Sequence, residues 1–579
     1  MKKKSLLYSL LLLGSVSFTG CTDMLEKEPL DTFTDNPLFW NNPSSVEGYA
    51  NTFYNQFTGY GTSGSGDFYF PSLTDDQVGA GFVNWKYINV PAANSNWSST
   101  WDEIRRSNAM IKSLEEKATT MDAATKNHWI GVARMMRAYQ YWDLVRKFGD
   151  CPWVDHPLDV NDPLLYAARE DRDMIMDKVL EDLIFAVNNI QESTSKTTWS
   201  RNMARAMKSH ICLWEGTFRK YRSEADHQKA PDLAGAERFL KECVTECEYL
   251  MSQYTLSDNY QALYNSVTLT GNPEVIFCKE YRQDVMGHST INYICSSTPI
   301  NGMSKDAFDS YLFLDGKTKD KTSYDNTDVP VMMVSANDGM QHLNINNLLK
   351  VRDKRLAMQI DSVLCYQGNG WPRLKEGIAM TSSTGYCVSK FDNVSLPKGY
   401  REIGNKNYTA APLYWLSVIY LEFAEAKAEL ADMGKGTITD EDLNNSINKL
   451  KARAGLPAIT TTVEDMRSDY EIQKNVSPLI AEIRRERRCE LMFDNDFRYW
   501  DLIRWHQLDK LDTTKNPDIV LGANIAADPA STEELTSEGY IKAKDDGFDR
   551  KYEYKHYWYP IPSGQISLNE NLGQNPGWE

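Results

Sequence analysis

The stretch that decides the fold is Ile483-Arg-Arg-Glu-Arg-Arg-Cys-Glu-Leu-Met-Phe493, followed by Asp494-Asn-Asp-Phe-Arg-Tyr-Trp-Asp-Leu-Ile-Arg-Trp505. Apolar residues recur at helical spacing in both parts, and a tight Asp-Asn-Asp turn separates them. Asp496 stands where a side chain can cap the second helix. The stretch therefore predicts two amphipathic helices joined by a short turn.

Charged residues in this stretch predict how the helical hairpin is held. Glu482 with Arg485, and Arg487 with Glu490, are opposite charges three residues apart, which lie on one face of a helix. Three further residues are expected to fix the hairpin against its neighbours: Arg498, Asp501 and Arg504.

The pattern of helix, short turn and helix recurs along the chain. Helical pairs are predicted at 101–118 and 124–148, at 171–191 and 200–222, at 411–433 and 439–454, and at 478–493 and 497–510, with a lone helix at 234–253. Alanines stand at the close contacts of these pairs, which is typical of a tetratricopeptide-like shell, although no strict repeat period survives. A generic all-α bundle also fits the periodicity.

Three regions lack this periodicity. Between about 255 and 410, Gly, Pro, Asn and Ser dominate, and Glu274-Val-Ile-Phe277 reads as a strand. Residues 36–100 and 512–579 are similarly irregular. Long loops in a compact body are either functional or disordered, and these carry aromatic residues, so we expect them to be ordered and functional.

Composition excludes several classes of protein. The 579 residues are 41% hydrophobic, which is enough for a large core, and carry a net charge of −17. A surface with this charge repels phosphate backbones, so nucleic acid is not expected as a partner. The 31 Tyr, 20 Phe and 15 Trp suit both helix packing and flat apolar ligands.

Residues 1–20 read as a bacterial export signal. Lys2, Lys3 and Lys4 precede an apolar run from Leu6 to Leu13, which is too short to span a bilayer. The segment Phe18-Thr19-Gly20-Cys21 is similar to a lipoprotein box, so Cys21 is the expected lipidation site. Acidic residues follow the cysteine closely, and we expect the anchored protein to face the cell exterior.

The sequence has no convincing motif of catalysis or metal binding. Gly59 to Gly64 matches a dinucleotide glycine pattern but has no strand before it and no helix after it. We interpret the acid pairs Asp75/Asp76 and Asp545/Asp546 as solvated loop residues, and nothing marks an enzyme. No cofactor is expected; a structural calcium stays open, because the acidic loops show no committed ligand spacing.

The nine cysteines after Cys21 include no Cys-x-x-Cys pair. Cys243 and Cys247 are one helical turn apart, which could hold a soft metal, but two ligands without a nearby histidine do not make a site. We expect buried free thiols.

The quoted stretch resembles the C-terminal signature of the SusD/RagB-family lipoproteins. Further segments are similar to the family in the same order along the chain: Trp97 to Asn108, Arg137 to Pro152, Asn272 to Phe277, Tyr420 to Ala426, Ile447 to Gly455, Tyr559 to Pro562 and Asn569 to Trp578. The resemblance thus covers nearly the whole mature chain.

The resemblance implies an all-α tetratricopeptide-like shell with one loop-rich face and a few short strands. It divides the chain into a signal peptide at 1–20, an N-terminal helical region at 21–250, a loop-rich ligand-face insertion at 251–410 and a C-terminal helical region at 411–579. Members of the family act as lids on a SusC-like TonB-dependent outer-membrane transporter, to which they deliver a glycan. The implied protein is a lipid-anchored glycan-binding protein and not an enzyme.

Candidate ligand residues follow from chemistry and loop position. Sugar rings stack on Trp and Tyr faces, while Asn, Asp and Arg satisfy their hydroxyls. Three groups are predicted: Trp85 with Asp76, Asn84 and Tyr87; Tyr281 with Arg282; and Trp371, which the glycines of Gly368-Asn-Gly-Trp-Pro372 are expected to leave exposed. Six tryptophans on helical stripes are assigned to the core: Trp97, Trp101, Trp142, Trp214, Trp500 and Trp505.

Other functions stay open at this point. Some relatives of this fold capture peptides, and the sequence does not exclude a peptide ligand. A glycoside hydrolase would need two carboxylates converging across an aromatic cleft. A tetratricopeptide scaffold that binds only protein partners would not depend on Trp85.

Overall fold

The computed structural model describes residues 35–62, 73–79, 84–296, 301–325, 329–374, 377–494, 497–544 and 549–579. Within these ranges the chain is mostly helical, with short two-stranded sheets and long loops between the helices. The expected all-α shell with a loop-rich face and a few short strands is therefore confirmed.

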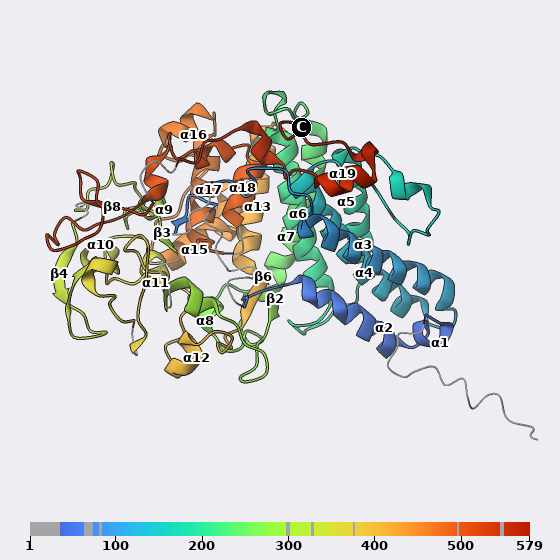
Figure 1. Ribbon diagram of the computed structural model, residues 1–579, viewed down its shortest axis with the longest axis horizontal. Helices are drawn as coiled ribbons and strands as arrows, with labels where there is room; N and C mark the ends of the chain where they lie inside the picture. Colours follow the sequence, from blue (N-terminus) through green and yellow to red (C-terminus); the bar gives the residue numbers. More distant parts are fainter. Residues whose placement is uncertain are drawn as a thin grey trace, which may run out of the picture.

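Five long helices form the N-terminal part of the shell: α3 (Ser95–Lys117), α4 (Ala123–Phe148), α5 (Arg172–Asn189), α6 (Arg201–Tyr221) and α7 (Leu233–Gln253). Neighbours in sequence pack on each other, α3 on α4, α4 on α5, α5 on α6 and α6 on α7, which Figure 1 shows in one half of the molecule. A polar side chain caps the first turn of each helix: Asn94, Asp122, Asp171, Ser200 and Asp232.

A second helical group follows the loop-rich region: α13 (Leu416–Asp432), α14 (Asp440–Asn445), α15 (Ile447–Ala454), α17 (Pro478–Glu490) and α18 (Phe497–Arg504). α13 joins the two groups, because it packs on α6 and α7 as well as on α15 and α17. The remaining helices are short: α1 (Pro37–Trp40), α2 (Pro43–Ala50), α8 (Ala262–Asn265), α9 (Lys305–Ser310), α10 (Asn346–Leu349), α11 (Leu356–Gln359), α12 (Lys398–Glu402), α16 (Asp469–Gln473) and α19 (Ser563–Leu568).

Four antiparallel strand pairs join segments of the loop-rich region: β1 (Gln77–Val78) with β3 (Gly302–Met303), β2 (Val275–Lys279) with β6 (Ala411–Trp415), β4 (Val331–Val334) with β5 (Gln341–Asn344), and β7 (Leu521–Asn524) with β8 (Tyr540–Lys542). The strand predicted at Glu274–Phe277 is confirmed as β2. The helix predicted from residue 411 begins only at Leu416, because the five residues before it pair with β2.

One large cluster of buried apolar side chains extends from Trp40 to Leu572 and so includes residues from every part of the described chain. Five of the six tryptophans assigned to the core are buried: Trp97, Trp142, Trp214, Trp500 and Trp505. Trp101 is only half-buried, so its assignment to the core was too strong.

The helical hairpin of α17 and α18 is held by ion pairs, but not all of them are the predicted ones. Arg485 Nη1 donates to Glu482 Oε2 at 2.8 Å, as expected. The prediction that Arg487 pairs with Glu490 is wrong, because Arg487 Nε donates instead to Asp501 on α18 at 2.7 Å. Glu490 accepts hydrogen bonds from Arg355 and Arg453. The predicted cap Asp496 lies outside the described residues.

Eight cysteines are free and buried in the described part of the chain, which agrees with the prediction for them. The signal peptide and Cys21 lie outside the described residues. Within the described ranges, no helix combines the length and apolarity that a membrane span requires.

Candidate functional site

Asp75 and Asp76 directly precede β1 and are buried, with 0% and 4% of their surfaces exposed. Arg498 donates to both carboxylate oxygens of Asp75 at 2.7 Å, and Arg488 Nε donates to Asp76 at 2.7 Å. Although burial raises it, Arg488, Arg498 and Lys510 hold the pKa of Asp75 well below its usual range. The interpretation of this pair as solvated loop acids is therefore wrong.

Asp76, which is predicted to bind a ligand beside Trp85, is already paired with an arginine. Its carboxylate is directed at Arg488, and burial raises its pKa above the usual value. Sequence could not reveal this, since the arginine is 412 residues away. A role for Asp76 in ligand binding stays a prediction.

Trp85 is covered by the C-terminal segment. Its Nε1 donates to the Lys551 carbonyl oxygen at 2.6 Å, and its ring stacks on the His556 imidazole with centroids 4.1 Å apart. Only 6% of its surface is exposed, although a ring that stacks on a sugar would have to be exposed. Its role as a sugar platform stays a prediction, which would need the C-terminal segment to move aside.

The neighbours of Trp85 in the loop are more accessible. Tyr87 is half-buried, packs edge-on against Tyr559 at 4.9 Å and accepts a hydrogen bond from Asn94 at 2.8 Å. Asn84 is half-buried as well, and its buried Oδ1 has no hydrogen-bond partner among the described residues. Both remain candidate ligand residues.

Tyr281 and Arg282 differ in exposure. Tyr281 is 8% exposed, its hydroxyl donates to the Tyr60 carbonyl oxygen, and its ring packs edge-on against His288 at 4.8 Å. Arg282 is exposed, and its backbone pairs with that of Met286. The structure thus presents the arginine to solvent while the tyrosine serves packing.

Trp371 is more exposed than Trp85 and Tyr281, the leading aromatic residues of the other two predicted groups. Its side chain is half-buried, its φ is +55°, and a Cβ at the preceding Gly370 would meet nothing within 4 Å. The ring has no aromatic, cationic or hydrogen-bond partner in the described part of the chain. A bulky residue with positive φ is rare and strained, and such strain clusters at functional sites.

The three predicted groups contact different parts of the molecule. Trp85 and Tyr87 pack on residues 551–559, and Tyr281 packs on residues 58–60 and His288. Trp371 belongs to a loop that contacts Asp338, to which the Arg373 backbone N–H donates at 3.4 Å. None of the seven residues lines the cavities described below.

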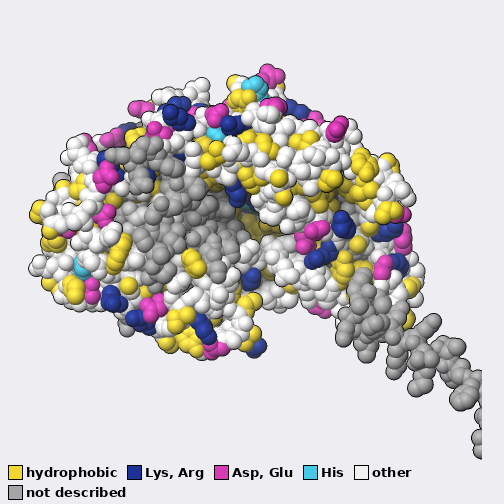
Figure 2. All heavy atoms as spheres, viewed as in Figure 1, with side chains coloured by type: hydrophobic (Ala, Val, Ile, Leu, Met, Phe, Trp, Pro, Cys, Tyr) yellow, Lys and Arg dark blue, Asp and Glu magenta, His cyan; other side chains and the backbone are white. Residues whose placement is uncertain are grey.

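A small aromatic cavity of about 140 Å³ was not predicted. The helices and strand that line it are α4, α6, β6, α13 and α18; they meet near the middle of Figure 1, where Figure 2 shows the surface hollowed. The Arg146 guanidinium lies between the rings of Trp142 and Trp500, at 4.1 and 4.4 Å. Ligand cavities usually exceed about 300 Å³, so this one holds a single ring at most.

A larger groove of about 740 Å³ runs between α3, the loop at 152–166 and α19; we call it the side groove. Half-buried Trp101 and Tyr166, which is 63% exposed, supply aromatic faces. Polar side chains stand beside them: Ser98, Asp102, Arg105, Asn108, His156, Gln565 and Asn569. Helical spacing hid Trp101 among core residues, and the signal that could have found the groove is the Leu164-Leu165-Tyr166 run in a polar loop.

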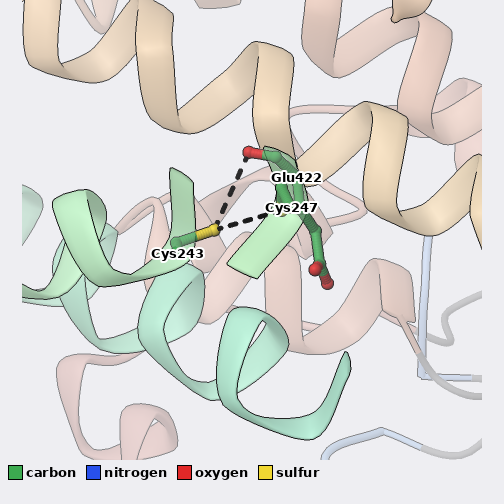
Figure 3. A group of neighbouring side chains, drawn as sticks. All are labelled: Cys243, Cys247 and Glu422. Atoms are coloured by element: carbon green, nitrogen blue, oxygen red, sulfur yellow. Dashed lines mark hydrogen bonds between the residues drawn. The ribbon is translucent and has the colours of Figure 1, made fainter. Parts of the chain in front are cut away.

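Cys243, Cys247 and Glu422 form the group closest to a metal site among the described residues, with one ligand atom of each within 4.8 Å of the others. Figure 3 shows that the dashed line from the Cys243 sulfur ends on the backbone carbonyl oxygen of Glu422 and not on its carboxylate. Both carboxylate oxygens already have partners at 2.8 Å, Ser209 Oγ and His210 Nδ1. The group therefore offers two buried thiols, whose pKa values burial raises.

Comparisons with known proteins agree with this architecture. The family model described as "SusD family" matches residues 273–578, and the model described as "Starch-binding associating with outer membrane" matches residues 72–204. A search of the curated proteins returned no match.

Solved structures share the fold along most of the chain. A SusD-like carbohydrate-binding protein from Bacteroides fragilis is 20% identical with a TM-score of 0.67, and the match covers 92% of this chain and 99% of that one. A second SusD-like protein from Bacteroides fragilis is 20% identical with a TM-score of 0.64, covering 95% and 100%. A laminarin-binding SusD-like protein is 16% identical with a TM-score of 0.54, covering 92% and 98%. With a family model matching more than half of its length, the chain belongs to the SusD family.

Proposed function

We propose that the protein is a glycan-binding lipoprotein of the outer membrane, which captures an oligosaccharide or polysaccharide and hands it to a SusC-like TonB-dependent transporter. The family model over residues 72–204, described as starch-binding and associating with the outer membrane, supports the ligand class and the location. The laminarin-binding neighbour supports a glucan among the first ligands to test. Cys21 would carry the lipid anchor, and the acidic residues after it would direct the protein to the outer face.

The observation that carries the ligand class is the side groove. Its volume of about 740 Å³ suits several sugar units, and Trp101 and Tyr166 offer faces on which sugar rings stack. Asp102, Gln565 and Asn569 stand beside these faces as partners for sugar hydroxyls. Such a surface binds by stacking and hydrogen bonding, and capture requires no bond to break.

The loop residues predicted from sequence offer three alternative sites, since the three groups contact different parts of the molecule. Trp371 is the first of these, because its side chain is half-buried and has no aromatic, cationic or hydrogen-bond partner among the described residues. Tyr87, Asn84 and Arg282 also retain accessible surface. Trp85, Asp76 and Tyr281 would join only after a rearrangement, since their side chains are buried.

The test is calorimetry on soluble protein that begins after Cys21, titrated with a panel of neutral polysaccharides that includes laminarin. Four variants locate the site: Tyr166→Ala and Trp101→Ala in the side groove, Trp371→Ala in the loop, and Trp85→Ala under the C-terminal segment. Tyr324→Ala is the matched control, because Tyr324 is an exposed aromatic, 39% accessible, that lines none of these sites.

We expect saturable binding with intact glycan recovered afterwards. Affinity should fall about fivefold or more in the variants of one site, since a stacked aromatic contributes about 1 kcal/mol. Loss in Trp371→Ala alone would move the site from the groove to the loop. Released sugar would overturn the capture proposal, and binding of peptides instead of any glycan would overturn the ligand class.

A further inference from the structure

A cavity of about 710 Å³ opens between α9, α16, α17 and the segment that follows α18; we call it the cationic cavity. Eight of its lining residues are basic: Lys319, Lys321, Arg467, Arg484, Arg485, Arg488, Arg498 and Lys510. Five are acidic: Asp306, Asp309, Asp320, Asp469 and Glu471. This excess of cations is unusual in a chain where acids outnumber bases by 80 to 63.

Three arginines reach the cavity from two helices. Arg484 and Arg488 are one turn apart on α17 and so share a face of the helix. Arg498 projects from α18, the other arm of the hairpin. All three are buried or nearly so, with 4%, 5% and 13% of their side chains exposed. The hairpin thus brings three guanidinium groups together where water is largely excluded, and each of them pairs with a buried or partly buried carboxylate.

Arg484 has hydrogen-bonding capacity that the protein does not use. Its Nη2 donates to Glu429 at 3.0 Å, but Nε and Nη1 are buried and have no partner among the described residues. The guanidinium lies over the Trp505 ring at 4.4 Å and near the Tyr221 ring at 4.9 Å, and rings accept no in-plane hydrogen bond. Buried donors without acceptors are costly, so they indicate a missing ligand or ordered solvent.

Arg488 and Arg498 each use two of their three guanidinium nitrogens on buried aspartates. Arg498 uses Nε and Nη2 on Asp75, and Arg488 uses Nε on Asp76 and Nη2 on Asp306 and the Asp75 carbonyl oxygen. The Nη1 atoms of both have no hydrogen-bond partner in the described ranges. The buried aspartates therefore fix the two guanidinium planes and leave an edge of each for a ligand.

Lys319 and Tyr470 also line the cavity. Burial lowers the pKa of Lys319; the positive charges of Lys305 and Arg352 lower it further, while Asp309 raises it. A half-buried Tyr470, whose hydroxyl donates to Asp509 at 2.7 Å, presents its ring at the wall. A ligand that combines a flat ring with negative charge would satisfy both.

We infer that the cationic cavity binds an oxyanion, namely the sulfate ester or carboxylate of an acidic glycan. Guanidinium forks match the geometry of such oxyanions, and the volume admits the sugar that bears the group as well. The glycan source rests on the proposed function, whereas the oxyanion site itself does not, because a free sulfate or phosphate ion offers the same oxygens.

The test uses the mature protein with three probes: sodium sulfate, a sulfated laminarin oligosaccharide and its unsulfated counterpart. Lys319→Gln/Lys321→Gln removes charge at the mouth without touching the buried ion pairs, and Arg484→Gln removes the unpaired donors. Lys112→Gln/Lys515→Gln is the control, since both lysines are exposed and line no part of the cavity. Circular dichroism confirms that each variant is folded.

We expect sulfate to bind, and the sulfated oligosaccharide to bind at least about tenfold more tightly than the unsulfated one. The affinities for sulfate and for the sulfated oligosaccharide should fall about tenfold in the cavity variants and stay unchanged in the control. Binding of sulfate with equal affinity for the two oligosaccharides would support the oxyanion site and assign it to a free ion. Absence of binding by all charged probes, or equal binding in the variants, would overturn the inference. If sulfate does not bind and the two oligosaccharides bind equally well, the inference is overturned but the proposed glycan binding stands.

Discussion

Arg498 holds Asp75 with two parallel hydrogen bonds of 2.7 Å, from Nε to Oδ1 and from Nη2 to Oδ2, across 423 residues of chain. Arg467 holds Asp465 in the same two-bond geometry, at 2.9 and 2.7 Å, across two residues. The two pairs differ in burial, since the Asp75 side chain is 0% exposed and that of Asp465 is 48% exposed. They form a natural comparison of a buried and an exposed ion pair.

Replacing the arginine of each pair should therefore have unequal effects. We expect Arg498→Gln to lower the free energy of unfolding by about 2 to 3 kcal/mol, because it leaves a buried carboxylate with fewer partners. Arg467→Gln should lower it far less, because water replaces the lost partner. Urea denaturation at pH 7 measures both, and equal losses would contradict the assigned role of burial.

Lys390 and Asp494 form a pair whose side chains are both completely buried, with Nζ 2.6 Å from Oδ1. Lys390→Met should destabilise the protein by about 3 to 5 kcal/mol, because it leaves the carboxylate unpaired in the core. The double variant Lys390→Met/Asp494→Leu should recover most of this loss, because desolvation no longer opposes folding. A double-mutant cycle in urea gives the coupling; additive losses would argue against it.

The same carboxyl should give the stability an unusual pH dependence. Burial raises the pKa of Asp494 to about 6, in spite of Lys390, so the native state binds this proton more tightly than the unfolded chain. Its contribution to stability is fully present below pH 3.8 and is lost as the pH rises through 6, by about 2 to 3 kcal/mol. The measurement is the unfolding free energy of the wild type minus that of Asp494→Asn, from pH 4 to 7. This value should fall as the pH rises, because only the wild type loses stability through this group. A value that rises with pH would contradict the prediction.

Trp371 should reveal its backbone strain by comparison of two substitutions. Trp371→Gly and Trp371→Ala both remove the ring, but glycine accepts a φ of +55° without the steric cost that alanine meets. We expect the glycine variant to be more stable by up to about 1 kcal/mol.

Trp153 supplies the control for this comparison, since it is a half-buried tryptophan that is not among the residues with positive φ. There the glycine variant should be less stable than the alanine variant, because glycine loses more conformational freedom on folding. Thermal unfolding of the four variants is sufficient, and the same ordering at both positions would remove the argument for strain at Trp371.

Helical periodicity was enough to predict the shell, because amphipathic stripes and capping residues act locally. The helix predicted at 124–148 is α4 (Ala123–Phe148) to within a residue, since Asp122 caps its start and Gly149, with a φ of +73°, ends it. The strand β6 was missed because its partner β2 lies more than 130 residues earlier, and pairing at that distance leaves no local signal.

The site was less predictable for the same physical reason. Exposure of Trp85 depends on His556 and Lys551, which approach only in the folded chain. Asp75 and Asp76 read as solvated because their arginines are more than 400 residues away. Trp371 was the exception, since flanking glycines do predict an open loop and the structure leaves its ring half-exposed.

The C-terminal segment closes over the start of the helical shell, where Lys551 and His556 cover Trp85, and Ser563 and Gly564 donate backbone hydrogen bonds to Pro91 and Ala92. The part of the core around Trp85 therefore cannot be completed until residues 551–564 have been synthesised. A truncation before residue 551 should uncover Trp85 and cost more stability than a single substitution within this segment.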